Sequence, residues 1–111
     1  MPVKLTDGEI AQIQERYSYL TSYDADDPEC PIDPLTYADS NGDQLLHIAA
    51  QRGDLSTLQL LIRVGVDVNL LGDMGCTALH YARMNGHHDV AALLLDCGAS
   101  EALLNQFGKP P

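Results

Sequence analysis

Two histidines and a cysteine are the side chains of this sequence best suited to chemistry. His47 and His80 lie 33 positions apart, and Cys76 precedes His80 by four. A thiol and an imidazole at this spacing could serve as nucleophile and base. Catalysis would also need groups that stabilise an oxyanion, and no residue pattern near Cys76 provides them. We therefore interpret both histidines as structural, and we predict no catalytic residue and no enzymatic activity.

Metal binding is the second chemistry to test. His87 and His88 are adjacent and precede Asp89, so on a helix the two imidazoles would point about a quarter of a turn apart. A zinc site needs more ligands on one side. The cysteines also lack the close spacing of a zinc site or of a disulfide framework. They are Cys30, Cys76 and Cys97. We expect no metal and no cofactor.

The two histidines recur because the sequence repeats. Residues 42–69 align with residues 75–102 at an offset of 33, and eight of the 28 aligned pairs are identical. A fixed period of this length is typical of stacked repeat proteins. The identical pairs are Gly42 with Gly75, Leu46 with Leu79, His47 with His80, Ala49 with Ala82, Gly53 with Gly86, Leu60 with Leu93, Leu61 with Leu94, and Gly65 with Gly98.

Glycines mark the ends of two short helical patterns in each unit. Gly53 and Gly86 follow the first pattern, and Gly65 and Gly98 follow the second. Glycine readily takes the left-handed conformation that ends a helix. Leucine and alanine recur at helical spacing and would form the buried face. Each unit is therefore predicted to be a turn, a helix, a tight turn and a second helix.

Residues 77–82 read Thr-Ala-Leu-His-Tyr-Ala, which resembles the Thr-Pro-Leu-His-x-Ala motif of the ankyrin repeat. The first unit departs from this motif, with Gln44 and Leu45 in the Thr and Pro places. The resemblance implies a hydrogen bond between the Thr77 hydroxyl and the His80 ring. It also implies an all-α ankyrin-repeat solenoid with two full helix-turn-helix repeats, β-hairpin fingers, an N-terminal helical cap and a truncated C-terminal cap.

The length of 111 residues corresponds to one domain. Residues 1–38 would form the cap helix and an acidic loop, and residues 39–71 the first repeat. Residues 72–104 would form the second repeat and residues 105–111 a partial third finger. The cap helix is predicted over residues 6–20.

Both ends of the stack are predicted to be covered. Thr6 and Glu9 have the spacing of a capping box at the start of the cap helix. One face of that helix is apolar and would cover the first repeat. It carries Ile10, Ile13, Tyr17 and Leu20. At the other end, Leu103, Leu104 and Phe107 are expected to fold over the last helix.

The net charge of −10 is uneven along the chain. Residues 1–40 contain nine acids and two bases, a net charge of −7, whereas residues 41–111 contain seven acids and four bases, a net charge of −3. Such acidity disfavours binding to nucleic acids and to anionic membranes. It favours association with a basic protein partner. The alternative is that the charge only keeps a small protein soluble.

The same residues suggest a location and an assembly state. The N-terminus has no apolar signal core, and no stretch approaches membrane-spanning length. Together with three scattered cysteines, this predicts a protein of the reducing cytoplasm. We expect a monomer when no partner is bound.

In ankyrin proteins, partners lie across the finger tips and the exposed residues of the first helices. In this sequence the apolar side chains at such positions are Met74, Met84 and Phe107, and acids surround them, as in many interfaces. The alternative is that these are ordinary variable surface residues. The full set of predicted partner-binding residues is Asp39, Ser40, Asn41, Asp43, Gln51, Arg52, Asp73, Met74, Cys76, Tyr81, Met84, Asn85, Gln106 and Phe107.

The whole chain also resembles the short, free-standing ankyrin proteins of bacteria, some of which are immunity proteins for secreted toxins. This resemblance implies a non-enzymatic interaction module that neutralises a basic toxin, such as a nuclease, through its concave face. The alternative is a regulatory adaptor that binds a resident cytoplasmic protein without inhibiting it. A thiol- or metal-dependent enzyme is a third class, which the scattered cysteines and histidines disfavour.

Overall fold

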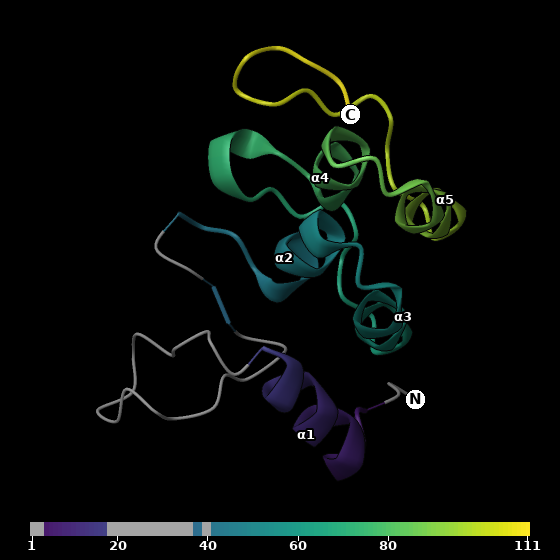
Figure 1. Cartoon of the computed structure of the whole chain (residues 1–111). Helices are drawn as coiled ribbons and strands as arrows, with labels where there is room; N and C mark the ends of the chain where they lie inside the picture. Colours follow the sequence, from purple (N-terminus) through teal and green to yellow (C-terminus); the bar gives the residue numbers. More distant parts are fainter. Residues whose placement is uncertain (1–3, 18–36, 39–40) are drawn as a thin grey trace.

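The computed structural model describes residues 4–17, 37–38 and 41–111. Its helices are α1 (Asp7–Arg16), α2 (Leu45–Arg52), α3 (Leu55–Arg63), α4 (Ala78–Met84) and α5 (His88–Asp96), with a 3-10 turn η1 (Asp73–Gly75) before α4. Helices α2 and α4 stack on one side, α3 and α5 stack on the other, and α1 lies at the open end below α3 (Figure 1). This arrangement confirms the predicted all-helical solenoid of two helix pairs.

Glycines end the helices as predicted. Gly53 and Gly86 have φ angles of 72° each, and Gly65 and Gly98 have 94° and 95°. The left-handed conformations of Gly53 and Gly86 let the chain reverse within two or three residues, so that α3 follows α2 and α5 follows α4 as antiparallel partners. The near-identical angles show that both repeats turn in the same way.

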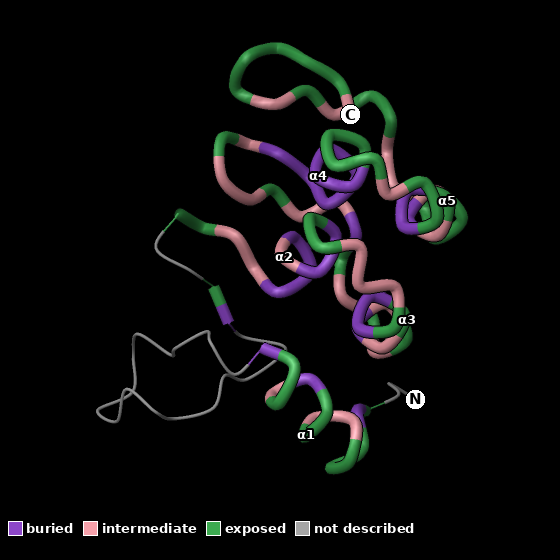
Figure 2. Tube along the Cα trace, in the orientation of Figure 1, coloured by how far each residue is buried: buried purple, intermediate pink, exposed green. Residues whose placement is uncertain are grey.

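The core lies where the two helix pairs meet (Figure 2). It is built mainly of leucine and alanine, and Ala49, Ala50, Leu58, Leu79 and Leu94 have no exposed surface. Small alanines allow α2 and α4 to approach closely, and the leucines of α3 and α5 fill the space between the two layers. The helical spacing of these residues in the sequence is therefore the spacing of the buried face.

The N-terminal helix covers the first repeat. Its capping box is formed: the Thr6 hydroxyl accepts from the Glu9 N–H at 3.2 Å, and Glu9 Oε1 accepts from the Thr6 N–H at 3.0 Å. Ile13 and Tyr17 are almost fully buried. The helix ends at Arg16, earlier than predicted, and Leu20 lies outside the described residues. The N-terminal cap is confirmed.

Polar contacts fasten this cap to the start of α3. Tyr17 donates its hydroxyl to Asp54 Oδ2 at 2.7 Å, and Arg16 Nη1 lies 2.7 Å from Asp54 Oδ1. Burial opposes the charge on Asp54, but hydrogen bonds from Thr57, Tyr17 and Arg16 outweigh it and lower the pKa of that carboxyl. Asp54 therefore both caps α3 and holds the N-terminal helix.

The fingers are turns in the part of the chain that the structure describes. The predicted β-hairpins are not confirmed there, where the only pairing is an isolated antiparallel bridge between Ala38 and Gln44. Between the helix pairs, the Gly72 N–H donates to the Cys76 carbonyl at 2.7 Å, and the Gly75 N–H donates back to the Gly72 carbonyl at 3.1 Å. This tight closure around η1 leaves no room for a ladder of strand pairs.

The prediction that Leu104 and Phe107 fold over the last helix is wrong. Both side chains are exposed, while Leu103 is partly buried. The reason is that the backbone of this segment lies against the preceding finger, because the Gln106 N–H donates to the Met74 carbonyl at 2.8 Å. The segment after α5 closes the top of the stack with its backbone and not with these two apolar side chains (Figure 1).

Candidate functional site

Most of the predicted partner-binding residues that the structure describes are exposed. Asp73 is partly exposed, whereas Asp39 and Ser40 lie outside the described residues. Arg52 is exposed too, but its guanidinium lies 5.4 Å from the centre of the Tyr17 ring, so it packs against the N-terminal cap. The exposed members are Asn41, Gln51, Arg52, Met74, Met84, Asn85, Gln106 and Phe107. Their role in binding a partner stays a prediction.

Two predicted contact residues are instead part of the core. Cys76 and Tyr81 are 5% and 7% exposed. The segment after α5 covers Cys76, and the Asn105 amide approaches its sulfur at 3.8 Å. Tyr81 lies on the inner face of α4, where its ring meets that of His47 edge to face at 5.9 Å between centroids. Neither side chain offers a surface to a partner.

Asp43 is also less free than predicted, because it joins the two repeats. Its Oδ1 accepts from the Asp73 N–H and from the Tyr81 hydroxyl, each at 2.8 Å. Burial, followed by this hydrogen bond, raises the pKa of Tyr81 and keeps the phenol protonated as a donor. Gly72 permits the contact, since a Cβ there would lie 2.4 Å from Asp43 Oδ1. Asp43 thus positions the second finger.

The exposed large apolar side chains reveal a pattern that the sequence interpretation missed. Leu71 and Leu104 are 57% and 58% exposed, and Met74 and Phe107 are 49% and 66% exposed. Both pairs are related by the repeat offset of 33. The signal that could have found Leu71 and Leu104 was this offset, applied to the fingers as well as to the helices. We call these four residues the finger stripe.

The backbone brings the two halves of the stripe together. The hydrogen bond from the Gln106 N–H to the Met74 carbonyl places the segment before Phe107 beside the second finger. Met74 is the only non-glycine residue with positive φ in the described ranges, at 57°. A long side chain rarely takes this conformation, and such strain is often found at functional sites. Met74 is therefore held outward at a local energetic cost.

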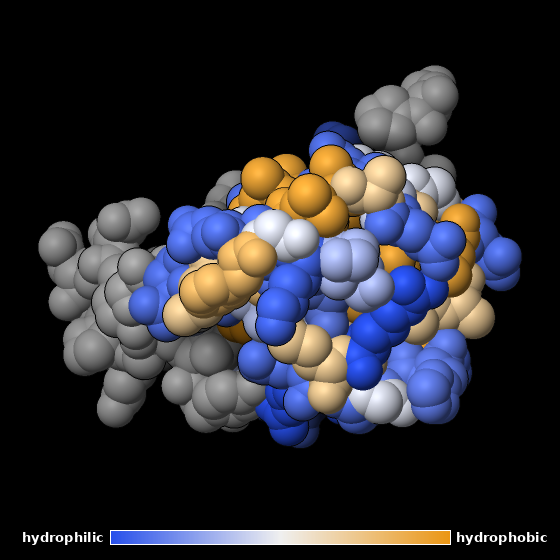
Figure 3. Space-filling model, turned by 90° about the horizontal axis from the view of Figure 1, so that it is seen from above, coloured by the Kyte–Doolittle hydropathy of each residue, from blue (hydrophilic) through white to orange (hydrophobic). Residues whose placement is uncertain are grey.

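Hydrophobic side chains are visible on the outside of this end of the molecule. Seen from above, orange patches lie among hydrophilic side chains over the C-terminal end of the stack (Figure 3). The two segments that carry the stripe, residues 67–75 and 100–108, contain Asp67, Asp73 and Glu101 and no base. Exposed apolar groups with an acidic border match the composition of a protein-binding surface.

Both repeated histidines are structural. His47 Nδ1 accepts from the Gln44 N–H at 3.0 Å, and His80 Nδ1 accepts from the Thr77 N–H at 2.9 Å and lies 2.8 Å from the Thr77 hydroxyl. The predicted bond between Thr77 and His80 is confirmed. The proton of each ring is on Nε2, which donates to Leu70 O at 2.9 Å and to Lys109 O at 3.1 Å. Each imidazole thus joins a helix start to a following loop.

Within the described ranges, no cluster of three or more His, Cys, Asp or Glu side chains could hold a metal ion. Of the cysteines, Cys76 is buried and Cys97 is exposed, and both are free thiols. No helix in the same part of the chain is long and apolar enough to span a membrane.

Comparisons with known proteins agree with this geometry. The family model described as "Ankyrin repeats (3 copies)" matches residues 18–105. The ARF GTPase-activating protein Git of Drosophila melanogaster is 41% identical over 64 residues, which is 58% of this chain and 9% of the relative. Protein phosphatase 1 regulatory subunit 27 of Homo sapiens is 35% identical over 66 residues, 60% of this chain and 43% of the relative.

A third relative, ankyrin repeat domain-containing protein 40 of Mus musculus, is 39% identical over 67 residues, covering 60% of this chain and 18% of the relative. The chain spans less than half the length of each of these three relatives. The similarity therefore extends to the repeats and not to the whole of any of these proteins.

Proposed function

We propose that this chain, which belongs to the ankyrin-repeat family, is a non-enzymatic module that binds a basic protein through its finger stripe. The family fold is a protein-interaction fold. The observation that carries the proposal is the two repeat-related pairs of apolar side chains on two adjoining fingers, since all four side chains are about half exposed or more. A buried interface centre of this kind contributes most of the binding energy, while acids around it attract the partner.

The net charge of −10 supports a basic partner. Of the described residues, ten are acidic and six are basic, a net charge of −4, and the other six acids lie outside the described ranges. Three of the six bases, Arg16, Arg63 and Arg83, are paired with acids. The remaining acidic surface would speed association with a positively charged protein.

Two roles fit this binding activity. In the first, the module inhibits a basic toxin, such as a nuclease, and so acts as an immunity protein; its net charge supports this role. In the second, it is a regulatory adaptor for a resident cytoplasmic protein, and the regulatory phosphatase subunit among its relatives supports that role. The free thiols of Cys76 and Cys97 suit a reducing cytoplasm in either case.

Affinity capture with matched variants tests the binding proposal. The wild-type chain, the double variant Met74→Ala/Phe107→Ala, and the control Gln59→Ala/Ala92→Gln would be immobilised and exposed to host extract. Gln59 and Ala92 are exposed and lie on α3 and α5, on the side away from the fingers (Figure 1). We expect one basic protein to bind wild type and control but not the stripe variant.

Kinetics on the purified partner then separate the contributions of charge and apolar contact. The stripe variant should dissociate faster, by about tenfold or more if either side chain is a hot spot. Asp73→Lys should mainly slow association and weaken its salt dependence. Equal binding by wild type and stripe variant would contradict the proposal. Loss of the partner's activity on binding would favour the inhibitor role, and unchanged activity the adaptor role.

A further inference from the structure

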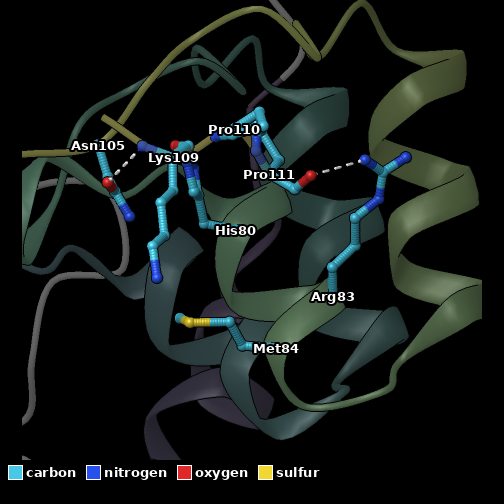
Figure 4. Close-up of a pocket in the computed structure, with 7 residues that line it drawn as sticks. All are labelled: His80, Arg83, Met84, Asn105, Lys109, Pro110 and Pro111. Atoms are coloured by element: carbon cyan, nitrogen blue, oxygen red, sulfur yellow. Dashed lines mark hydrogen bonds between the residues drawn. The ribbon is translucent and has the colours of Figure 1, made fainter. Parts of the chain in front are cut away.

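A hollow of about 250 Å³ lies beside α4, between this helix and the segment after α5 (Figure 4). His80 and Met84 line it from the helix, and Lys109, Pro110 and Pro111 line it from the segment. It is separate from the finger stripe, because none of the four stripe residues lines it. Its lining is mostly apolar, and Met84 is 65% exposed.

Hydrogen bonds fix the wall of this hollow. The Lys109 carbonyl accepts from His80 Nε2 at 3.1 Å and from the Asn105 N–H at 2.9 Å, while the Lys109 N–H donates to Asn105 Oδ1 at 3.1 Å. At the far end, Arg83 Nη1 donates to the Pro111 carbonyl at 3.0 Å (Figure 4). The backbone that carries the lysine and the two prolines is therefore held at both ends.

The charge of the hollow is opposite to that of the molecule. Arg83 and Lys109 line it, and none of the described lining residues is acidic, in a chain with 16 acids and six bases. Arg83 is compensated by Glu101, whose carboxylate lies 2.6 Å from its guanidinium. The exposed Lys109 side chain thus supplies a positive charge at the edge of an apolar surface.

We propose that this hollow binds a short acidic peptide segment that carries one apolar side chain. The apolar side chain would pack on Met84 and Pro110, and a neighbouring carboxylate would pair with the Lys109 ammonium. The occupant has the opposite charge to the partner of the finger stripe, so this is a second site with its own specificity. The negative charge of the rest of the surface would repel acidic segments from other parts of the molecule.

The 111-residue chain can be tested with defined peptides. The probe is a fluorescein-labelled peptide Glu-Glu-Leu-Glu-Glu with blocked ends, and fluorescence anisotropy follows its binding. Glu-Glu-Gly-Glu-Glu keeps the charge without the apolar side chain, and Lys-Lys-Leu-Lys-Lys reverses the charge. We expect saturable binding of the first peptide, weakened about fivefold or more when the leucine and its apolar contact are removed. The third peptide should leave the hollow empty, so any binding to the acidic border of the finger stripe should not shift the resonances of residues 80–84 and 109–111.

Two charge-reversal variants complete the test. Lys109→Glu should weaken binding about three- to tenfold, since it replaces attraction by repulsion at a partly exposed site. Lys4→Glu is the matched control, because Lys4 is the other lysine of the chain, is exposed, and lies before α1 at the opposite end of the stack (Figure 1). The control should bind like wild type.

Amide resonances of both variants, compared with wild type, check that each is folded. Binding shifts should concentrate on residues 80–84 and 105–111. The proposal is overturned if Lys109→Glu and Lys4→Glu weaken binding equally, if the leucine and glycine peptides bind alike, or if the shifts lie elsewhere. Self-association of the chain that the peptide does not reverse would also overturn it, by assigning the hollow to a second copy.

Discussion

In the first repeat, Ala50 has no exposed surface and lies on α2, the helix that packs against α4. The equivalent residue of the second repeat, 33 positions on, is the exposed Arg83, which binds Glu101 and the Pro111 carbonyl. The same position is thus a packing site in the first repeat and a polar site in the second. Ala50 is small enough for the neighbouring helix to approach, whereas Arg83 faces the segment after α5 and remains accessible to water.

The histidines show the same division. His47 Nε2 donates to the Leu70 carbonyl, and His80 Nε2 donates to the Lys109 carbonyl rather than to Leu103, the equivalent of Leu70. The motif therefore places the donating His Nε2 at the start of the helix in both repeats. The acceptor is a backbone carbonyl of the segment that follows the second helix, and its position in that segment differs between the repeats. The different path at the C-terminal end is what creates the hollow around Lys109.

Exchanging the residues at the first of these positions should produce the largest effect. Ala50→Arg would force an unpaired charge into a filled core, and we expect it to lose more than about 4 kcal/mol of unfolding free energy. The reciprocal Arg83→Ala removes only exposed contacts and should change stability by about 1 kcal/mol or less. Urea denaturation followed by circular dichroism measures both. Similar losses of unfolding free energy for the two variants would contradict the assignment of Ala50 as buried and Arg83 as exposed.

The two ends of the stack provide the next comparison. Ile13→Ala should lose about 2–5 kcal/mol, because the side chain is almost fully buried between α1 and the first repeat. Phe107→Ala should change stability by about 0.5 kcal/mol or less, since the ring is exposed. Thermal melting of both variants measures the two stability losses. A large loss for Phe107→Ala would restore the original expectation that this ring covers the last helix.

Asp43 links the repeats, so its removal should affect both. Asp43→Ala leaves the Asp73 N–H and the buried Tyr81 hydroxyl without their acceptor and should cost about 1–3 kcal/mol. Asp73→Ala is the control, because it removes only the Asp73 side chain and keeps the backbone N–H that donates to Asp43. We expect it to change the unfolding free energy by about 0.5 kcal/mol or less. Urea denaturation compares the two. Equal effects would show that the Asp43 contacts contribute little.

The same link makes stability depend on alkaline pH. Burial and the Asp43 hydrogen bond raise the folded-state pKa of Tyr81 above the unfolded value of 10.0. The folded state then holds a proton that the unfolded state releases, so unfolding free energy falls as pH rises above about 10, by up to about 1.4 kcal/mol per pH unit. Tyr81→Phe lacks this group and should lose stability less steeply. Parallel slopes in urea titrations across this range would contradict the assignment.

The fold could be predicted because its determinants are local. Gly53 and Gly86 set the turns, alanine and leucine set the faces, and Thr6 with Glu9 sets the start of α1; each acts through its own backbone or its nearest helical neighbours. Because the helix and turn pattern recurs 33 residues later, the glycine, alanine and leucine signals each appear twice. Such patterns need no knowledge of distant contacts.

The candidate site was harder to predict because exposure depends on what packs alongside. Asp43, Cys76 and Tyr81 were predicted to contact a partner, yet Tyr81 donates a hydrogen bond to Asp43 and the segment after α5 covers Cys76. These contacts join residues 29 to 38 positions apart and arise from this chain's own side chains. These contacts cannot be predicted from the sequence without knowing where the loops lie in the folded chain.

The smallest effect tests whether the first repeat is weakened by its departure from the motif. Thr77 caps α4, and its hydroxyl lies 2.8 Å from His80 Nδ1, whereas the equivalent of Thr77 before α2 is Gln44. A threonine is a better first-turn cap than glutamine, because its short hydroxyl reaches the free N–H groups with less loss of side-chain entropy. Gln44→Thr should therefore stabilise the chain by about 0.5–1 kcal/mol. Thr77→Gln should destabilise it by more than that, since the longer side chain must enter a buried position. Urea denaturation of the two single variants gives both values, and a destabilising Gln44→Thr would show that Gln44 already satisfies the start of α2.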